Sequence, residues 1–347
     1  MILKVTIIKN NQRKERIKLI SVITSTYNKA KYLDLTLAGY QMQNYKNFEL
    51  VIVDDGSNDN TEYMIEKYKS VLNIKYYKQK NLGAATARNR ALQLAEGNYI
   101  IIVDDDRIPC PDFVLEHKKV LDARGQVVSI GKQGLIISQF IPELNLKFKD
   151  GFNLYNKYPE LLSSNNKQLF EADDIINNFD QVIDKYYLSD YNEESLAEMV
   201  EKFGDNLEKF YMAWSKAYGG NMAFDRRFCK QELKYDNNYK GYGCEDIDFS
   251  YQLYLQDYHF SFSRNAINYH QEHKRGVNEA RDSYKNFQYF YNKYSHLEVL
   301  LMKMDFDGVI SLGEANSFLN MIYSHYENLD LPIKDYVKRK VKYKNAN

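Results

Sequence analysis

Three consecutive aspartates, Asp104 to Asp106, directly follow the apolar run Tyr99 to Val103, which has the composition of a buried strand. Carboxylate oxygens are the ligands that Mg²⁺ and Mn²⁺ prefer. Such an ion could neutralise the negative charge that develops when the bond between a sugar and a diphosphate breaks. The aspartates therefore indicate a metal and diphosphate site, for which an acidic surface loop after a core strand is the alternative.

A second polar cluster, Asp54-Asp55-Gly56-Ser57, ends the apolar run Phe48 to Val53. The Asp55 carboxylate could accept the imide N–H of uracil, while Thr26 and Tyr27, one strand earlier, would line the base. Asp, Gly, Ser and Asn are also the residues of ordinary tight turns, so a turn without function is the alternative.

A third cluster lies in the segment GYGCEDIDF, where Gly241 and Gly243 allow close approach and Glu245 and Asp246 open a helical pattern. An acceptor hydroxyl must lose its proton as it attacks an anomeric carbon, and a positioned carboxylate can take that proton. Two adjacent acids would allow one to hold the acceptor and the other to deprotonate it. The alternative is structural, because acids in the first turn of a helix complement its dipole.

Two further side chains could act with these acids. Arg88, on the helix after Asn81-Leu82-Gly83, could contact a phosphate, and a cation on a solvated helix face is the alternative. His270 follows a strand predicted for His259 to Ile267 and could ligate a metal as a neutral imidazole. His273 competes for that role, and a packed or surface histidine is the alternative.

The elements that must position these residues alternate between strand and helix over the first 130 residues. Near-continuous apolar strands separated by helices imply a parallel sheet covered on both faces, whose ligands bind beyond the carboxyl ends of the strands. Asn28 is the predicted cap of the first helix and Asp59 that of the second, and Gly97 closes the third. The predicted strands are 19–23, 48–53, 74–77 and 99–103, and the third helix is 84–95.

Together these segments resemble the family 2 glycosyltransferases of the GT-A fold. The segments SVITSTYNKAKYL, FELVIVDDGSNDNT, NLGAATARNRAL and GNYIIIVDDD follow that family's order and spacing over residues 19–106. The segments YGGNMAFDRRF and GYGCEDIDFSYQL are similar to the catalytic region of beta-1,4-galactosyltransferases and chondroitin-polymerase-type enzymes. The resemblance lapses in 135–210 and after 275. The sequence departs from many relatives at Ser25, where they carry proline, and at Tyr242, where they carry tryptophan.

The resemblance implies an α/β fold of the GT-A type: a Rossmann-like, mostly parallel sheet flanked by helices, with a helical C-terminal extension. It also implies a metal-dependent transferase that moves a hexose or N-acetylhexosamine from a UDP-sugar to an acceptor hydroxyl. Inversion at the anomeric carbon would give a beta linkage, with Mn²⁺ or Mg²⁺ as cofactor. In the implied roles, Asp246 is the base and Glu245 contacts the acceptor. The donor would lie against Ser25, Thr26, Tyr27, Asp55, Arg88, Asp104 and Asp105, and the metal would bind Asp104, Asp106 and His270.

The chain divides into four predicted regions. Residues 1–130 form the nucleotide-sugar-binding half, 131–210 a variable, partly helical insertion, 211–278 the acceptor and catalytic half, and 279–347 a helical C-terminal region. Within the last region, Lys303 to Glu314 is similar to a calcium-binding EF-hand loop, but Lys303 stands where the first carboxylate ligand belongs. A helix–turn–helix packing element is therefore predicted there.

The composition narrows the class of protein and its setting. The 347 residues include 47 basic and 47 acidic side chains, a balance that disfavours a dedicated nucleic-acid binder. Three cysteines without paired spacing favour a reduced, cytoplasmic setting. Apolar runs fall short of the ~18 residues of a membrane-spanning helix. The basic tail, Lys338 to Lys344, could contact the inner membrane face peripherally, with a solvated helix end as the alternative.

Two other functions compete with sugar transfer. A nucleotidyltransferase on a similar sheet would also use metal-bound carboxylates, but it needs no acceptor base in GYGCEDIDF. A non-catalytic nucleotide-sugar or glycan-binding protein would keep the fold and give neither hydrolysis nor transfer. The acceptor stays open among a polysaccharide, a lipid-linked glycan, a peptide and a small metabolite. The donor sugar stays open among galactose, N-acetylgalactosamine, glucose and N-acetylglucosamine.

Overall fold

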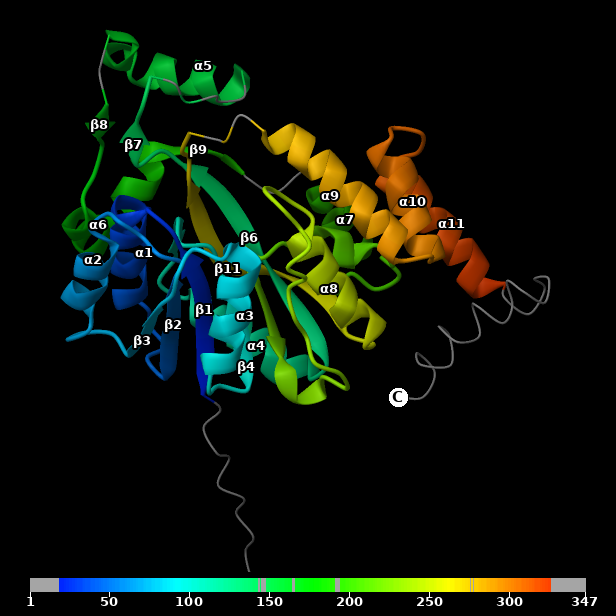
Figure 1. The fold of residues 1–347 in the computed structure, drawn as a ribbon. Coiled ribbons are helices and arrows are strands. Elements are labelled where there is room, and N and C mark those ends of the chain that lie inside the picture. Colours follow the sequence, from blue (N-terminus) through cyan, green and yellow to red (C-terminus); the bar gives the residue numbers. More distant parts are fainter. Residues whose placement is uncertain are drawn as a thin grey trace, which may run out of the picture.

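Nine strands in the described part of the chain form one mixed β-sheet at the centre of the molecule (Figure 1). The computed structural model describes residues 19–325, apart from 143, 145–147, 164–165, 191–193, 275 and 277, so the basic tail lies outside the described residues. The strands of this sheet are β1 (Ile20–Thr26), β2 (Phe48–Asp54), β3 (Ile74–Lys78), β4 (Tyr99–Ile102), β5 (Arg107–Pro109), β6 (Val127–Ile136), β9 (Tyr187–Asp190), β10 (Met222–Asp225) and β11 (His259–Gln271).

Helices cover both faces of this sheet (Figure 1). The α-helices of the first two regions are α1 (Ala30–Gln41), α2 (Thr61–Tyr68), α3 (Ala84–Leu94), α4 (Phe113–Arg124), α5 (Phe148–Lys157), α6 (Ala172–Tyr186) and α7 (Glu194–Phe203). They are followed by α8 (Glu245–Leu255), α9 (Glu279–Lys293), α10 (Leu297–Phe306) and α11 (Leu312–Ser324). Short 3₁₀ helices lie at Pro159–Ser163, Ala213–Lys216 and Arg226–Phe228, and the strands β7 (Gln139–Phe140) and β8 (Lys167–Gln168) form a separate small pair.

The sheet has a parallel half and a mixed half. Strands β3, β2, β1 and β4 lie side by side in parallel, as the alternation of strands and helices predicts. Strand β10 then runs antiparallel to both β4 and β6, whereas β6 and β11 run parallel to each other. The predicted α/β architecture is therefore confirmed, with antiparallel neighbours joining its two halves.

Both faces of the parallel half are buried because successive strand residues point to opposite sides. In β1, Val22 packs in the hydrophobic cluster that holds Leu33 and Leu37 of α1. Its neighbour Ile23 packs in the cluster that holds Ala87 and Ala91 of α3. This explains why the strands read as continuous apolar runs rather than as alternating patterns.

Strand β1 extends beyond its predicted end at residue 23 and includes Thr24, Ser25 and Thr26. These three residues keep parallel pairing with β2, up to Thr26 opposite Asp54. Backbone pairing does not require apolar side chains, so a strand can continue past the end of an apolar run. The apolar run therefore predicts an end of β1 that is too early. Gly97 does not close the third helix, because α3 ends at Leu94. A Cβ on Gly97 would overlap Ser21 and the backbone of Leu19, so the glycine allows close packing against β1.

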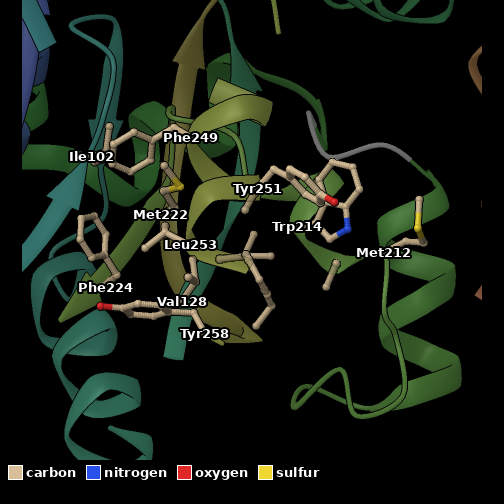
Figure 2. Packing of buried hydrophobic residues seen from close by; sticks show 14 of the residues in the cluster. Ile102, Val128, Met212, Trp214, Met222, Phe224, Phe249, Tyr251, Leu253 and Tyr258 are labelled. Carbon is tan, nitrogen blue, oxygen red and sulfur yellow. The ribbon is translucent and has the colours of Figure 1, made fainter. Parts of the chain in front are cut away.

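The C-terminal helices share a hydrophobic core with the central sheet. Figure 2 shows part of this cluster, in which Trp214 and Tyr251 lie together, while Met222 and Phe224 of β10 lie beside Phe249. Phe290 of α9 joins it with its ring 6.0 Å from that of Trp214. In the part of the chain that the structure describes, no helix combines the length and apolarity that crossing a membrane requires.

The segment similar to an EF-hand loop joins α10 to α11. The Lys303 ammonium, in the last turn of α10, pairs with Asp307, the residue that caps the C-terminal end of this helix. Glu314, which would have been the last ligand, instead caps α11: its Oε2 accepts the N–H of Ser311 at 2.7 Å. These contacts support the predicted helix–turn–helix packing element.

Candidate active site

A cleft of about 990 Å³ opens where β1, β2 and β4 end. Because parallel strands end at the same edge of a sheet, their polar ends meet there. Helix α8 and strand β11 close the cleft from the other half of the sheet. Its lining includes every predicted site residue: Ser25, Thr26, Tyr27, Asp55, Arg88, Asp104, Asp105, Asp106, Glu245, Asp246 and His270.

Asp55, the predicted uracil contact, is buried at one end of the cleft. Its Oδ1 accepts the N–H of Leu82 at 2.9 Å and the side-chain amide of Gln79 at 2.8 Å. Its Oδ2 accepts the N–H of Gly83 at 2.8 Å. A carboxylate offers about four lone-pair sites, so these three bonds orient the group and leave room for one further donor. Tyr27 is 45% exposed in the same cleft.

The loops after β1 and β2 are tied together beside this pocket. Asn28 has a left-handed backbone (φ 53°), donates its N–H to Ser57 Oγ at 2.9 Å, and accepts the N–H of Asn58 at 2.8 Å. The prediction of Asn28 as a helix cap is therefore wrong: α1 begins at Ala30, whose N–H is accepted by Asp59 Oδ2 at 3.0 Å. Spacing along the chain could not reveal this, because the capping group comes from the next loop.

Arg88 joins the aspartates after β4 to the acids that open α8. Its Nη2 donates to Asp104 Oδ1 at 2.9 Å, and its Nη1 donates to Glu245 Oε1 at 3.0 Å. Its Nη1 also lies 3.5 Å from Asp246 Oδ1, and its guanidinium lies 5.3 Å from the centre of the Tyr235 ring. The guanidinium is buried rather than on a solvated helix face, so Arg88 bridges Asp104 and Glu245, and its predicted contact with the donor stays a prediction.

Asp246 lies in a confined and weakly solvated position. Burial raises the pKa of its carboxyl to about 7; the negative charges of Glu245 and Asp104 add to the rise and the charge of Arg88 opposes it. Its buried Oδ1 makes no hydrogen bond. A Cβ at Gly219 would overlap this carboxylate, so the glycine leaves the space that Asp246 occupies. A carboxylate with a pKa near neutrality is suited to accept a proton at neutral pH.

Asp106, His270 and His273 form a group that could hold a metal ion, since one potential ligand atom of each lies within 4.8 Å of the others. His270 Nδ1 lies 3.2 Å from Asp106 Oδ1, and His273 Nε2 lies 3.1 Å from Asp106 Oδ2. Burial lowers the pKa of His270 to about 4, which keeps its imidazole neutral, the form that binds metals. The ammonium of Lys29 pairs with Asp106 and lies 3.0 Å from His273 Nε2.

The surroundings of Asp106 differ from the predicted ones in two respects. His270 lies inside β11, paired with Arg107 of β5, because the strand continues to Gln271 past its predicted end at residue 267. Asp104 is held by Arg88 and lies 3.6 Å from Arg107 Nη2, outside the group formed by Asp106 and the histidines. The metal role predicted for Asp104 stays a prediction.

Three residues of the site carried no signal in the sequence. Lys29 and Arg107 place positive charge against Asp106, with Arg107 Nε 3.8 Å from its Oδ1. Asn286 of α9 donates from its side-chain amide to the carbonyl oxygens of Lys240, Tyr242 and Gly243, and thereby holds the loop before α8. Asn286 lies in the region where the recognised motifs lapse, so only the fold identifies it.

Comparisons with known proteins agree with this geometry. Residues 21–162 match the family model described as "Glycosyl transferase family 2". The chain is 30% identical to a chondroitin synthase of Escherichia coli, over 82% of this chain and 40% of that protein. It is 28% identical to a hyaluronan synthase of Pasteurella multocida, over 77% of this chain and 26% of that protein. It thus spans less than half the length of either relative.

The fold is shared with a solved structure. The crystal structure of S. aureus TarS matches with a TM-score of 0.51 and 18% sequence identity, covering 82% of this chain and 43% of that chain. The identity is low, so this likeness concerns the fold alone.

Proposed function

This chain carries a family 2 glycosyltransferase domain, and we propose that it is an inverting transferase that moves a hexose or N-acetylhexosamine from a UDP-sugar to an acceptor hydroxyl. The observation that carries the proposal is the position of Asp246. Its carboxyl, with a pKa of about 7, faces the same cleft as Asp55 and as the aspartates after β4. The residues proposed for the donor pocket and for the base thus line one cleft.

In the proposed reaction the acceptor oxygen attacks the anomeric carbon from the side opposite the diphosphate. The new carbon–oxygen bond forms as the bond to the phosphate oxygen breaks, and the bonding electrons leave with UDP. Asp246 takes the proton of the acceptor hydroxyl, while Glu245 accepts a hydrogen bond from a second hydroxyl of the acceptor. One displacement on an alpha-linked donor gives a beta-linked product.

A divalent ion fits the group formed by Asp106, His270 and His273. One carboxylate and two imidazoles suit Mn²⁺ better than Mg²⁺, which prefers oxygen ligands. When bound, such an ion would stabilise negative charge on the departing diphosphate. The ammonium of Lys29 contacts Asp106 and His273, two of the three prospective ligands, so it has to leave these atoms when the ion binds. Asp104 and Asp105 are proposed to lie against the donor.

The relatives support a glycan acceptor. Their names describe enzymes that synthesise chondroitin and hyaluronan, both of which are polysaccharides. A growing polysaccharide is therefore the proposed acceptor class. Because the chain spans less than half of these relatives, its own donor sugar and linkage are left to experiment.

Thermal stabilisation by nucleotides tests this proposal directly. The protein is heated with UDP, GDP, CMP or TDP, each with and without Mn²⁺. We expect UDP to raise the melting temperature and Mn²⁺ to enlarge the rise, since a ligand that binds the folded state stabilises it. UDP-galactose, UDP-N-acetylgalactosamine, UDP-glucose and UDP-N-acetylglucosamine are then compared. A chain that no nucleotide stabilises at millimolar concentration would contradict the proposed donor class.

A further inference from the structure

An aromatic surface borders the cleft on the side of the C-terminal helices. It consists of Tyr284 and Phe287 of α9 and Phe306 of α10, which we call the aromatic shelf. The Phe287 and Phe306 rings stack with centroids 4.2 Å apart, and the Tyr284 ring lies 6.4 Å from that of Phe306. Phe287 is buried against Phe306, whereas Tyr284 is 54% and Phe306 45% exposed. The shelf thus presents two exposed aromatic rings, one of which stacks on a buried ring.

The shelf is continuous with the cleft that contains Asp246. Phe287 and Phe306 line that cleft, and so does Tyr242 of the loop before α8, which is 48% exposed. Asn286, one residue before Phe287, bonds to the carbonyl oxygen of Tyr242 at 3.1 Å. Helix α9 therefore carries part of the shelf and also fixes the backbone of the loop that presents Tyr242.

The chemistry of this surface is that of a sugar-binding site. A pyranose ring has apolar C–H faces and a rim of hydroxyls, so it fits an aromatic face that has polar groups beside it. Ser283 and Glu279 of α9 line the same cleft and supply such groups. An acyl chain would instead require a broad apolar surface without acids. The surroundings of the shelf therefore favour a glycan over a lipid tail.

We propose that Tyr242 and the aromatic shelf bind an oligosaccharide acceptor, so that the enzyme recognises at least two sugars and not the terminal one alone. The terminal sugar lies at Glu245 and Asp246, and the preceding sugars extend over Phe306 and Tyr284. This inference rests on the proposed function, whose acceptor is a glycan chain, and adds residues of α9 and α10 to the surface that binds this acceptor.

A glycan array with saccharides of one to six sugars, including chondroitin and hyaluronan fragments, tests the inference in the presence of UDP and Mn²⁺. We expect the wild-type protein to bind oligosaccharides and to bind monosaccharides weakly. Phe306→Ala should weaken oligosaccharide binding by about tenfold, because aromatic side chains carry much of the binding free energy at contact surfaces. Phe318→Ala removes an equally exposed phenylalanine of α11 outside the cleft lining and should have no effect.

Melting temperatures with and without UDP show whether each variant folds and binds the donor. The inference is overturned if the wild-type protein binds no oligosaccharide, if Phe306→Ala binds as the wild type does, or if mono- and oligosaccharides are affected equally. Phe306-dependent binding to anionic phospholipid vesicles instead of glycans would also overturn it. Intact stabilisation by UDP in these cases would leave the proposed donor site standing, whereas its absence would count against the proposed function itself.

Discussion

Asp246 and Arg88 show how single charges shape this site. The Arg88 guanidinium is shared among Asp104, Glu245 and Asp246, and this sharing lets three partly buried carboxylates lie close together. Despite that cation, burial leaves the pKa of Asp246 near neutrality. The residue proposed as base is therefore basic enough to take a proton and ionised in part at neutral pH.

Replacement of Asp246 by asparagine should separate catalysis from donor binding. We expect Asp246→Asn to lower the transfer rate by about 10²–10⁴, since the amide cannot accept the acceptor proton. Stabilisation by UDP and Mn²⁺ should persist, because the donor pocket is formed by other residues. Initial rates and melting curves measure the two effects. Transfer at the wild-type rate by this variant would refute the assignment of the base.

The pH dependence of transfer follows from the raised pKa of the same group. The reaction needs the carboxylate, so kcat/KM should rise with pH through about 7 and become constant above it. The folded state also holds this proton more tightly than the unfolded state does. Asp246 therefore adds stability at low pH, and that contribution falls as pH rises from about 4 to about 7. A rate profile that is flat between pH 5.5 and 8 would exclude the assignment.

The ion pair between Lys29 and Asp106 leads to a prediction about the affinity for a divalent ion. The Lys29 ammonium pairs with Asp106 and competes with a divalent ion for the same carboxylate. Lys29→Met should therefore bind Mn²⁺ more tightly in the absence of nucleotide, as titration calorimetry or Mn²⁺ paramagnetic resonance would measure. Lys31→Met is the matched control, because Lys31 is an exposed lysine in the first turn of α1, two residues after Lys29. Equal affinities in both variants would mean that Lys29 does not compete with the ion.

At the scale of elements, helix α9 positions the loop that precedes α8. Asn286 is buried, accepts the N–H of Lys240 at 3.3 Å, and donates to three carbonyl oxygens of that loop. Backbone conformations in this loop are unusual: Gly241, Gly243 and Cys244 all have positive φ. The side-chain amide of Asn286 therefore restrains the backbone of this loop between Lys240 and Gly243.

Asn286→Ala should loosen this loop and impair acceptor use more than donor binding. We expect a stability loss of about 2–3 kcal/mol from the hydrogen bonds removed, together with a raised KM for the acceptor. Asn316→Ala is the matched control, because Asn316 is a buried asparagine that bonds to the backbone of Lys209 and Tyr211. It should cost similar stability without a change in acceptor KM. Equal acceptor KM values in the two variants would argue against a positioning role for Asn286.

At the scale of the whole molecule, the C-terminal helices belong to a hydrophobic core that they share with the central sheet. Phe287, Phe290, Val299, Leu301 and Leu319 lie in one hydrophobic cluster with Trp214 and with strand residues of the sheet. Removal of these helices would expose large aromatic side chains to water, at about 1.5–3 kcal/mol for each fully buried side chain. The boundary predicted at residue 279 thus separates regions of the sequence that share one core.

A chain truncated after residue 278 should therefore lose cooperative unfolding, as calorimetry or circular dichroism would show. A chain truncated after residue 325 is the control, because it keeps every contact described above, and it should unfold in one transition. If the shorter chain also melted cooperatively near the temperature of the control, residues 279–325 would form a separable unit rather than part of the core.

The sequence by itself determined the local features of this protein. The apolar strands, the polar residues at their carboxyl ends and the start of α8 at Glu245 could all be predicted, since strand burial and helix initiation depend on residues close in sequence. The family likeness added candidate roles for the site residues, and all of these roles stay predictions. The predictions from the sequence pattern were wrong where the structure depends on residues distant in sequence, as at the ends of β1 and β11 and at Asn28.

Only the tertiary structure decided how the charges are paired. Arg88 of α3 meets Glu245 of α8, Lys29 meets Asp106, and Asn286 holds the loop around Tyr242. None of these partners is near the other in sequence, and each pair forms because separate elements pack against one sheet edge. Burial at that edge also raises the pKa of Asp246. Desolvation depends on all surrounding atoms, so the sequence could name the acid but not its protonation behaviour.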